Sequence, residues 1–589
     1  MTQSRTHNCN ELRIEDAGKR VTLVGWYENI RRVSKNLGFV ILRDFYGTTQ
    51  IVPETEEMME KFLAVNCEST LLVEGVVRER SNKNPKIATG DIEVVPERVE
   101  VLGKCIYNEL PFEINRSKEA DENTRLKYRY LDLRNPEVKK KIVMRSRIVA
   151  DLRASMMAHD FLEITTPILT ASSPEGARDY LVPARNHPGK FYALPQAPQQ
   201  FKQILMTSGF DRYFQIAPCF RDEDARADRS PGEFYQMDME MAFASQEDVF
   251  AVIEDVLPPI FEKYGTYDVA SKAPFKRIAY NDAMEMYGSD KPDLRINLIV
   301  QDVTALLGDC GFDAFKDNVI KAVVIDNFTE TRKVIDALCD EVFVTCANKA
   351  YWFKADENGA LVGGISKFLT EKAEEVKKAL NLKPGDFVAL AAGKKLAAQK
   401  TAGAIRKIFG NKVEHCIDRE RYEFCWIVDF PMYEIGEESG QIEFCHNPFS
   451  MPQGGMDALC NEDPLSINAY QYDLVCNGIE LSSGAVRNHD PEIMVKAFEI
   501  VGLGEEAVKA KFPAMYNAFC YGAPPHAGIA PGVDRMIMLL TGDETIREII
   551  PFPMNKNAQD IMMGAPSAVD QKQLDDVHIA IVMPKENKE

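Results

Sequence analysis

Apolar and polar positions alternate in short runs along the first hundred residues, with the period of two that half-buried strands show. Turn residues such as Tyr46-Gly47 separate the runs, and a helix-like stretch, Glu56–Val65, precedes the fourth. The five strands expected on this pattern are Val21–Tyr27, Phe39–Leu42, Thr49–Val52, Leu71–Val77 and Ile92–Val95. This order favours a small β-barrel of the OB type, with an ordinary small β-domain as the alternative.

The hydrophobic pattern changes after residue 104. We interpret a polar stretch containing Arg125–Arg134 as a hinge, and we expect a helix over Pro136–Asp160, since proline is favoured in a first helical turn. Further on, β-branched runs expected as strands, such as Ala322–Ile325 and Val342–Thr345, alternate with helical stretches. Candidate functional residues flank this region, so an inserted α/β domain is the simplest account. We therefore expect a multidomain α+β protein divided into residues 1–104, 105–135, 136–292, 293–415 and 416–589.

Composition narrows the class of protein. With 589 residues, 45% of them hydrophobic and 27% charged, the chain fits a soluble globular protein of several domains. No apolar run approaches the roughly 18–20 residues of a membrane span, and the N-terminus lacks the apolar core of a signal peptide. The 13 cysteines form no C-x-x-C pair, which favours reduced thiols over disulfides or zinc. A cytoplasmic protein is expected.

The net charge of −20 argues, at first sight, against a nucleic-acid partner. The charge is unevenly distributed, because residues 1–149 carry 26 basic and 23 acidic side chains and the remaining residues carry 44 and 67. The N-terminal quarter is therefore at +3 and the rest at −23. Nucleic acid, if bound, is expected to dock on local basic patches in that quarter.

Several common nucleotide and hydrolase motifs are absent or weak. The sequence contains no P-loop, H-E-x-x-H or G-x-S-x-G pattern. Gly502-Leu-Gly504-Glu-Glu-Ala507 matches a relaxed dinucleotide fingerprint, but it follows the helix-like segment Pro491–Val501 rather than a strand. We interpret it as a turn between helices.

Two constellations precede residue 203. Phe161–Pro167 leads to Ser173–Tyr180, whose Pro-Glu-Gly sequence is typical of a mobile flap. In the second, a proline-stiffened loop, Leu194–Pro198, delivers Lys202 to the start of a helix, where it can meet a substrate carboxylate. The alternatives are an ordinary loop and a solvated surface lysine.

The third constellation joins Cys219–Arg229 to the alternating segment Glu233–Glu240. Gln236, Asp238 and Glu240 share one strand face, which is costly unless that face lines a polar cavity. A charged surface hairpin is the alternative.

The fourth constellation is split between two segments. Asp473 and Glu480 suit a Mg²⁺ ion that bridges phosphates, since this cation prefers carboxylate oxygens. Gly528–Arg535 opens an apolar helix, and Arg535 at this start suits a phosphate.

These residues resemble the class II aminoacyl-tRNA synthetases. Phe220–Asp224 with Glu233-Phe234 resembles their motif 2, Gly528–Arg535 their motif 3, and the segment ending at Pro167 their motif 1. The resemblance narrows to the bacterial-type aspartyl-tRNA synthetases and covers nearly the whole chain. The segments that carry it are Tyr128–Arg134, Pro174–Pro183, Tyr287–Arg295 and Asp429–Met432.

The resemblance implies a fold, an activity and partners. The fold is an OB-fold anticodon-binding barrel, an antiparallel-sheet catalytic domain and an inserted GAD-like domain, in a homodimer. The activity is that of an aspartate–tRNA ligase, which makes aspartyl-adenylate and pyrophosphate from L-aspartate and ATP with Mg²⁺, then charges tRNA-Asp. Whether tRNA-Asn is also charged stays open at this point.

The resemblance also implies roles around the amino acid. Lys202 and Arg487 are similar to the cations that grip the aspartate carboxylate, which an asparagine amide could not replace because it would present donors to donors. Asp238 is similar to the group near the ammonium, with Glu175 as its partner on the flap. Gln199 and His446 are expected near the aminoacyl group.

Around ATP, Arg221 resembles the arginine on the α-phosphate, and Glu223 the residue on adenine. Arg229 and Arg535 are similar to phosphate ligands. The remaining expected contacts are Asp222 with ATP, Gln236 with the adenylate, and Asp473 and Glu480 with Mg²⁺ and ATP. The residues expected to contribute most to catalysis are Arg221, Arg535 and Glu480.

In the barrel, Arg32, Phe39 and Gln50 resemble residues that stack on and read the anticodon, with Glu93 as a weaker candidate. Four positions depart from the family pattern: Ala197 replaces a frequent Ser, Asn447 a second His, and Pro531 a Phe or Ala, while Ser34 lies in a specificity loop of unfamiliar sequence. No core ATP ligand is lost.

Two rival interpretations explain the sequence less well. A ligase for asparagine or lysine on the same scaffold would not need Lys202 and Arg487 together, and those relatives lack the insertion. A regulatory paralogue without activity usually loses a motif arginine, whereas Arg221 and Arg535 are both present.

Overall fold

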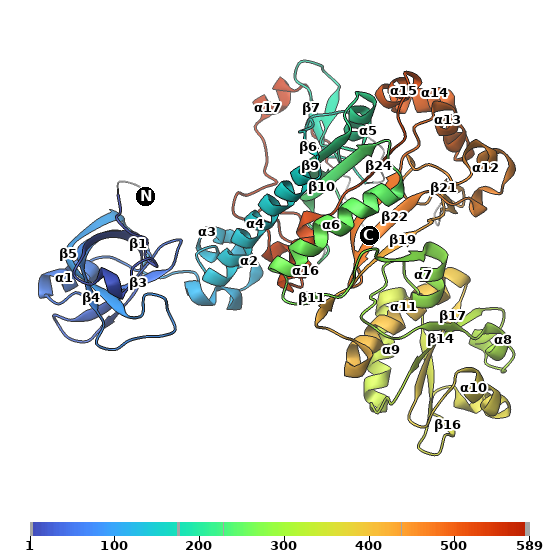
Figure 1. Ribbon diagram of the computed structural model, residues 1–589, viewed down its shortest axis with the longest axis horizontal. Helices are drawn as coiled ribbons and strands as arrows, with labels where there is room; N and C mark the ends of the chain where they lie inside the picture. The colour runs from blue at the N-terminus through green and yellow to red at the C-terminus, as the bar shows by residue number, and fades with distance from the viewer. Residues whose placement is uncertain (1–3, 173–176, 228, 437–438, 584–589) are drawn as a thin grey trace. The chain divides into compact units, whose positions relative to one another are not determined.

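The computed structural model describes residues 4–172, 177–227, 229–436 and 439–583. It divides into two compact units, residues 1–120 and residues 121–589, each of which is described by itself (Figure 1). The boundary falls inside the segment interpreted as a hinge. That segment's basic-aromatic stretch forms α2 (Glu122–Lys127) and α3 (Arg129–Asp132) of the second unit.

The first unit is a closed five-stranded barrel in the order β1-β2-β3-β5-β4. Its strands are β1 (Arg20–Arg32), β2 (Gly38–Arg43), β3 (Thr48–Ile51), β4 (Thr70–Glu79) and β5 (Ile92–Gly103). Helix α1 (Glu56–Leu63) lies between β3 and β4, and buries Met59 and Phe62. The predicted OB-type barrel is therefore confirmed, because the alternating apolar positions fill its interior, as Val21 and Leu23 do.

The second unit is built on an eight-stranded sheet in the order β12-β19-β22-β23-β24-β10-β9-β6. Neighbours run antiparallel except at its two ends, where β12 pairs with β19 and β6 with β9 in parallel. The strands are β6 (Leu162–Glu163), β9 (Arg212–Arg221), β10 (Gly232–Ala242), β12 (Lys276–Ala279), β19 (Phe424–Val428), β22 (Gln471–Cys476), β23 (Ile479–Val486) and β24 (His526–Ile529).

Helices pack on this sheet around the largest core. The expected long helix is α4 (Pro136–Ala158), which starts with proline in its first turn and an Asn135 cap. With α6 (Gln246–Tyr264) and α16 (Val533–Thr541), it buries apolar side chains such as Phe250 and Trp426, whose rings stack 4.0 Å apart. The antiparallel-sheet domain predicted for the catalytic region is therefore present.

The inserted region forms its own five-stranded sheet, in the order β13-β14-β17-β15-β16. Its elements are β13 (Val300–Asp302), α8 (Thr304–Leu307), β14 (Val319–Ile325), α9 (Arg332–Cys346), β15 (Ala350–Ala355), β16 (Leu361–Val362), α10 (Ala373–Ala379), β17 (Phe387–Gly393) and α11 (Lys395–Lys412). The strand expected at Val342–Thr345 was wrong, because these residues end α9. Ile335, Leu338 and Val342 recur on the buried side of that helix with helical spacing, which outweighs β-branching.

Smaller elements complete the second unit. They are β7 (Leu181–Pro183), β8 (Phe191–Ala193), α5 (Gln199–Thr207), β11 (Asp268–Val269), α7 (Tyr280–Tyr287), β18 (Arg421–Tyr422), β20 (Tyr433–Ile435), β21 (Ile442–Phe444), α12 (Gly455–Asn461), α13 (Pro491–Ile500), α14 (Glu505–Lys511), α15 (Pro513–Cys520) and α17 (Gln571–Asp576). Gly502 and Gly504 lie between α13 and α14, so the apparent dinucleotide motif is the expected turn between helices.

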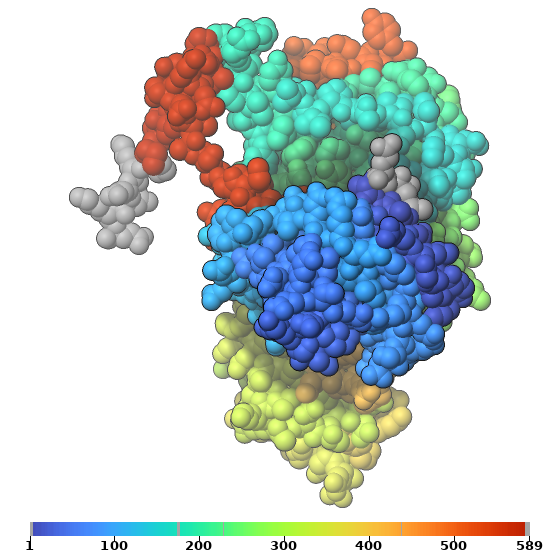
Figure 2. Space-filling view, turned by 90° about the vertical axis from the view of Figure 1, so that its left-hand side faces the viewer, coloured from blue at the N-terminus to red at the C-terminus, as the bar shows by residue number. Residues whose placement is uncertain are grey.

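The C-terminal segment that carries α17 lies on the surface and is drawn in red in Figure 2. Its side chains at Met563, Ile581 and Val582 are exposed. Across the ranges that the structure describes, no helix combines the length and apolarity needed to cross a bilayer.

Candidate functional site

A cavity of about 320 Å³ opens over the middle of the eight-stranded sheet, where β10, β23 and the motif 2 hairpin face the start of α16. Many of the residues singled out in the sequence line it. They are Ala197, Gln199, Lys202, Arg221, Glu223, Arg229, Gln236, Asp238, His446, Asn447, Glu480, Arg487 and Arg535. A concave site with converging polar groups is the usual form of a ligand pocket.

At one end, two cations and two carboxylates form a fully buried cluster. Lys202 Nζ, on α5, lies 2.9 Å from Asp238 Oδ1 and 3.2 Å from Glu240 Oε2. Arg487, just after β23, donates to the same Glu240 carboxylate from Nε at 2.9 Å and from Nη2 at 3.2 Å. All four side chains are at most 2% exposed. Glu240 therefore orients both cations, a role that sequence reasoning did not assign to it.

The pKa values of the two carboxylates in this cluster are shifted in opposite directions by their surroundings. Burial alone would raise the pKa of Glu240, but Arg487 and Lys202 hold it below its usual range. The pKa of Asp238 is raised by burial, which outweighs the lowering by Lys202. Arg487 Nη1 and Gln199 Nε2 are buried donors without a hydrogen-bond partner among the described residues, and both side chains line the cavity. Such donors are suited to a carboxylate that enters the cavity.

The other end of the cavity is formed by the hairpin of β9 and β10. Arg221 ends β9, and its guanidinium lies 5.0 Å from the centre of the Phe234 ring. Arg229 forms an ion pair with Glu223 across the hairpin loop. Asp222 is not among the residues that line the cavity, and its backbone pairs with that of Arg178. Its expected contact with ATP stays a prediction.

Motif 3 reaches the cavity through the first turn of α16. Arg535 donates from Nη1 to the backbone oxygen of Glu480 at 2.9 Å, which ties the helix to β23. The neighbouring Asp534 accepts from the backbone N–H of Tyr235 at 2.9 Å and from Arg145 of α4. Sequence reasoning missed Asp534, because neither partner lies near it in the chain.

Asp473 and Glu480 lie on the adjacent strands β22 and β23. Asp473 is 5% exposed, and burial together with the Glu480 charge raises its pKa well above the usual range. Lys291 Nζ lies 2.9 Å from Glu480 Oε2. Two carboxylates of this kind are the donor set that Mg²⁺ prefers, so the residues fit the expected cation.

The departures from the family pattern differ in their surroundings. Ala197 and Asn447 line the cavity, whereas Pro531 contributes its backbone oxygen, which accepts from Met237 N–H at 2.8 Å. Burial lowers the pKa of His446, which favours a neutral imidazole. Glu175, expected on the flap, lies outside the described residues.

In the barrel unit, Gln50 takes part in a charged network. It donates from Nε2 to Glu93 at 3.0 Å and accepts from Arg80 at 3.0 Å, so its amide orientation is fixed. Phe39 lies on β2 under Arg31, 5.6 Å from the guanidinium. Arg80 and Arg31 had not been singled out in the sequence. Arg32 donates to the backbone of Ser34, and both are exposed.

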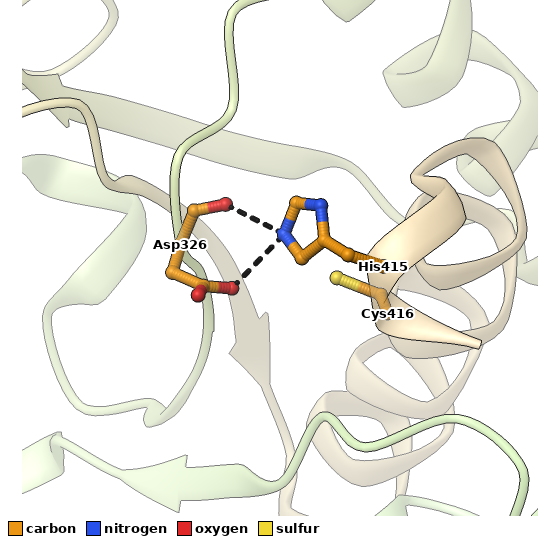
Figure 3. Close-up of side chains that lie close together, drawn as sticks. All are labelled: Asp326, His415 and Cys416. Atoms are coloured by element: carbon orange, nitrogen blue, oxygen red, sulfur yellow. Dashed lines mark hydrogen bonds and ion pairs between the residues drawn. The ribbon is translucent and has the colours of Figure 1, made fainter. Parts of the chain in front are cut away.

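A separate group of potential metal ligands lies in the insertion, where Asp326, His415 and Cys416 approach one another (Figure 3). His415 Nε2 is 3.2 Å from Asp326 Oδ1, and the three donor atoms lie within 4.8 Å. The Cys416 thiol is packed in the insertion core, and burial raises its pKa to about 11. A thiol must lose its proton to bind a metal ion, which this raised pKa disfavours. We therefore interpret the three residues as packing contacts of the loop after β14 and not as a metal site.

Two family models match most of this chain. The family described as tRNA synthetases class II (D, K and N) matches residues 121–556, and the OB-fold nucleic acid binding domain matches residues 21–102. The aspartate–tRNA ligase of Streptomyces coelicolor is 51% identical, over 99% of this chain and all of that protein. The aspartate–tRNA(Asp/Asn) ligase of Rickettsia akari is 50% identical, over 99% and 98%.

Solved structures agree with this fold at lower identity. The asparaginyl-tRNA synthetase from Pyrococcus horikoshii has a TM-score of 0.58 at 18% identity, and covers 94% of this chain and 98% of that one. The aspartyl-tRNA synthetase from Entamoeba histolytica has a TM-score of 0.55 at 20% identity, with 92% and 89% covered. With the full-length sequence matches, these findings show that the chain belongs to the aspartate–tRNA ligase family of class II aminoacyl-tRNA synthetases.

Proposed function

We propose that this protein is an aspartate–tRNA ligase, which activates L-aspartate with ATP and transfers it to tRNA. The observation that carries the proposal is the pair of buried cations, Lys202 and Arg487, that converge at one end of the cavity. Together they match a side-chain carboxylate. An asparagine amide would leave Arg487 Nη1 facing another donor, which discriminates strongly between two similar substrates.

The chain's own residues position both substrates for the first step. Lys202 and Arg487 hold the aspartate side chain, and Asp238 receives its ammonium. Arg221 and Arg535 hold the phosphates of ATP, so that an oxygen of the aspartate α-carboxylate faces the α-phosphorus. That oxygen bonds to phosphorus, the bond to the bridging oxygen breaks, and pyrophosphate leaves with the electron pair.

The second step uses the adenylate made in the first. A hydroxyl of the terminal ribose of tRNA attacks the aspartyl carbonyl and loses its proton to a phosphate oxygen of the adenylate, the bond between the carbonyl carbon and the bridging phosphate oxygen breaks, and AMP leaves with the electron pair. Asp473 and Glu480 are the residues that would hold Mg²⁺, which neutralises phosphate charge when it is bound with ATP. Most of the rate enhancement then comes from positioning and fixed charge.

Aspartate-dependent ATP–pyrophosphate exchange tests the activation step. We expect exchange with aspartate and at least about 100-fold less with asparagine, because the buried donors would be left unpaired. Exchange with asparagine equal to that with aspartate would refute the assignment.

We also propose that tRNA-Asp docks through the barrel, with Phe39 stacking on a base and Gln50 reading one. Phe39→Ala is expected to raise KM for tRNA about 5- to 150-fold without changing ATP–pyrophosphate exchange, because stacking contributes about 1–3 kcal/mol per base. Leu102→Ala, an exposed residue at the end of β5, is the matched control. An unchanged KM in Phe39→Ala would remove Phe39 from the tRNA contact.

The range of tRNAs is settled by charging each purified tRNA separately with aspartate. The relative from Streptomyces coelicolor is named for aspartate alone, and that from Rickettsia akari for tRNA(Asp/Asn). We propose tRNA-Asp as the substrate; aspartyl-tRNA-Asn formed at a comparable rate would extend the proposal to both.

We further propose a cytoplasmic homodimer formed through the motif 1 region, and a monomer in analytical ultracentrifugation would refute the dimer.

A further inference from the structure

The segment Tyr287–Arg295 is among those that carry the family resemblance, yet none of its residues has a role in the proposed chemistry. It begins at the end of α7, where Gly288 adopts a left-handed conformation with φ of 64°. The backbone N–H of Lys291 then donates to Ser289 Oγ at 3.0 Å, which turns the chain toward β23. The loop therefore brings the Lys291 side chain to Glu480, which lines the cavity and neighbours the buried Asp473.

Lys291 makes direct ionic contact with Glu480 of that pair. Its Nζ lies 2.9 Å from Glu480 Oε2 and 3.7 Å from Asp290 Oδ2, with the side chain 40% exposed. The other cation near Glu480 is Arg535, whose Nη1 is 3.8 Å from Oε1. Lys291 thus provides the short ion pair to the Glu480 carboxylate.

The insertion holds this loop in place. A side chain at Gly288 would collide with the backbone of Gln399 and Gly403, both on α11. From the same helix, Arg406 donates to the backbone oxygen of Asp293 at 2.8 Å. The loop is therefore fixed at both ends, while the long lysine side chain between them keeps rotational freedom.

We propose that Lys291 is a resident counter-cation of the Asp473–Glu480 pair, which gives up its place when a divalent cation binds there. This deepens the proposed function, because it rests on Asp473 and Glu480 as the metal-binding residues. Two neighbouring carboxylates, one of them buried, repel each other without a positive partner. A half-exposed ammonium neutralises them when no metal is bound, and can swing toward solvent or phosphate at low cost when one is.

Mn²⁺ binding to the nucleotide-free protein, followed by electron paramagnetic resonance of the free ion, tests this exchange. In the wild type the metal must displace Lys291, so removing the competitor in Lys291→Met should tighten Mn²⁺ binding about tenfold or more. Lys291→Arg keeps the charge and should bind Mn²⁺ like the wild type. Lys377→Met, which removes the same charge from α10 in the insertion, is the matched control and should change nothing.

Two results would overturn the proposal. Mn²⁺ affinity in Lys291→Met that is equal to or weaker than in the wild type would show that Lys291 does not compete with the metal. A raised KM for ATP combined with unchanged Mn²⁺ affinity would make Lys291 a phosphate ligand instead. Lys291→Gln provides a second neutral variant, and thermal unfolding of each variant verifies folding.

Different measurements test the role of Lys291 and the proposed ligase activity. Aspartate-dependent exchange is measured in the wild type alone, and its absence would refute the ligase assignment whatever the Mn²⁺ data show. Loss of Mn²⁺ binding in Glu480→Gln, with wild-type exchange present, locates the bound ion at the carboxylate pair.

Discussion

Two acidic pairs lie on the same sheet, and they are neutralised in different ways. Asp238 and Glu240 are matched by two equally buried cations, Lys202 and Arg487, within 3.2 Å. Glu480 forms a short ion pair with a lysine that is 40% exposed, whereas the neighbouring Asp473 interacts with Ser483 rather than with a buried cation of its own among the described residues. The first arrangement is preorganised for a substrate that brings both charges. The second is suited to a cation that arrives and leaves with its ligand, so the difference separates amino-acid recognition from metal exchange.

The largest effect on activity is expected from removing a cation of the buried cluster that Asp238 and Glu240 form with Lys202 and Arg487. Arg487→Leu should lower aspartate-dependent exchange at least about 30-fold, because truncating one partner of a buried hydrogen-bonded charge pair costs about 2–5 kcal/mol. Since this change leaves Glu240 with one cation, the double variant Arg487→Leu/Glu240→Gln provides a folding control. Near-normal exchange in Arg487→Leu would exclude Arg487 from the site.

Removing the Glu240 charge from the same cluster should mainly reduce the stability of the fold. Glu240 has a lowered pKa, so its charge stabilises the fold above about pH 4.5, and this stabilisation is lost as the pH falls through the lower, folded-state pKa. Glu240→Gln is expected to lower the free energy of unfolding at pH 7 by about 3–5 kcal/mol, the usual cost of breaking a buried pair. Urea titration measures it. A loss below about 1 kcal/mol would mean that Lys202 and Arg487 do not depend on Glu240.

His526, which is buried next to this cluster, should make the stability of the fold depend on pH. His526 is fully buried, contacts Gln203 and the Pro524 oxygen, and faces Glu240, Arg487 and His489. Burial lowers the pKa of His526 from 6.5 to about 4, so its contribution to stability is full above pH 6.5 and is lost as the pH falls toward 4.

For His526, the difference between a pKa of 6.5 and one of about 4 corresponds to about 3 kcal/mol of stability. His526→Gln lacks the titrating group, so its loss of stability between pH 7 and pH 4 should be smaller than that of the wild type by about this amount. Chemical denaturation at a series of pH values measures the difference. Parallel pH profiles would contradict the assignment.

The smallest predicted change in stability is an increase, and it is expected at Asp473. Asp473 is buried beside Glu480 without a short ion pair of its own among the described residues, so its charge opposes folding. Asp473→Asn is expected to raise the free energy of unfolding at pH 7 by about 1 kcal/mol, while it lowers exchange activity. Thermal unfolding and exchange, measured together, test both halves. Destabilisation by Asp473→Asn would erase the contrast between the two acidic pairs.

Local patterns predicted much of the fold because each depends on neighbouring residues. Alternation gave the barrel strands, and proline with its Asn135 cap marked the start of α4. The same local reasoning failed at Val342–Thr345, where the buried face of α9 outweighed β-branching. Propensity is weak compared with the burial of a complete amphipathic face.

The site could be predicted as far as its motifs reach. Arg221, Lys202, Asp238 and Arg487 were found in the sequence, and all four line one cavity. Asp222 was expected with them; its backbone pairs with that of Arg178, and its contact with ATP stays a prediction.

By itself, the sequence determined which elements form, which family the motifs resemble and which polar residues need partners. Only the tertiary structure decided the partners: Glu240 with Arg487 across 247 residues, and Lys291 with Glu480 through a loop held by the insertion. The physical reason is distance along the chain. Helix and strand periodicity arises from neighbours a few residues apart, whereas the charge of a buried group is set by whatever the fold brings beside it.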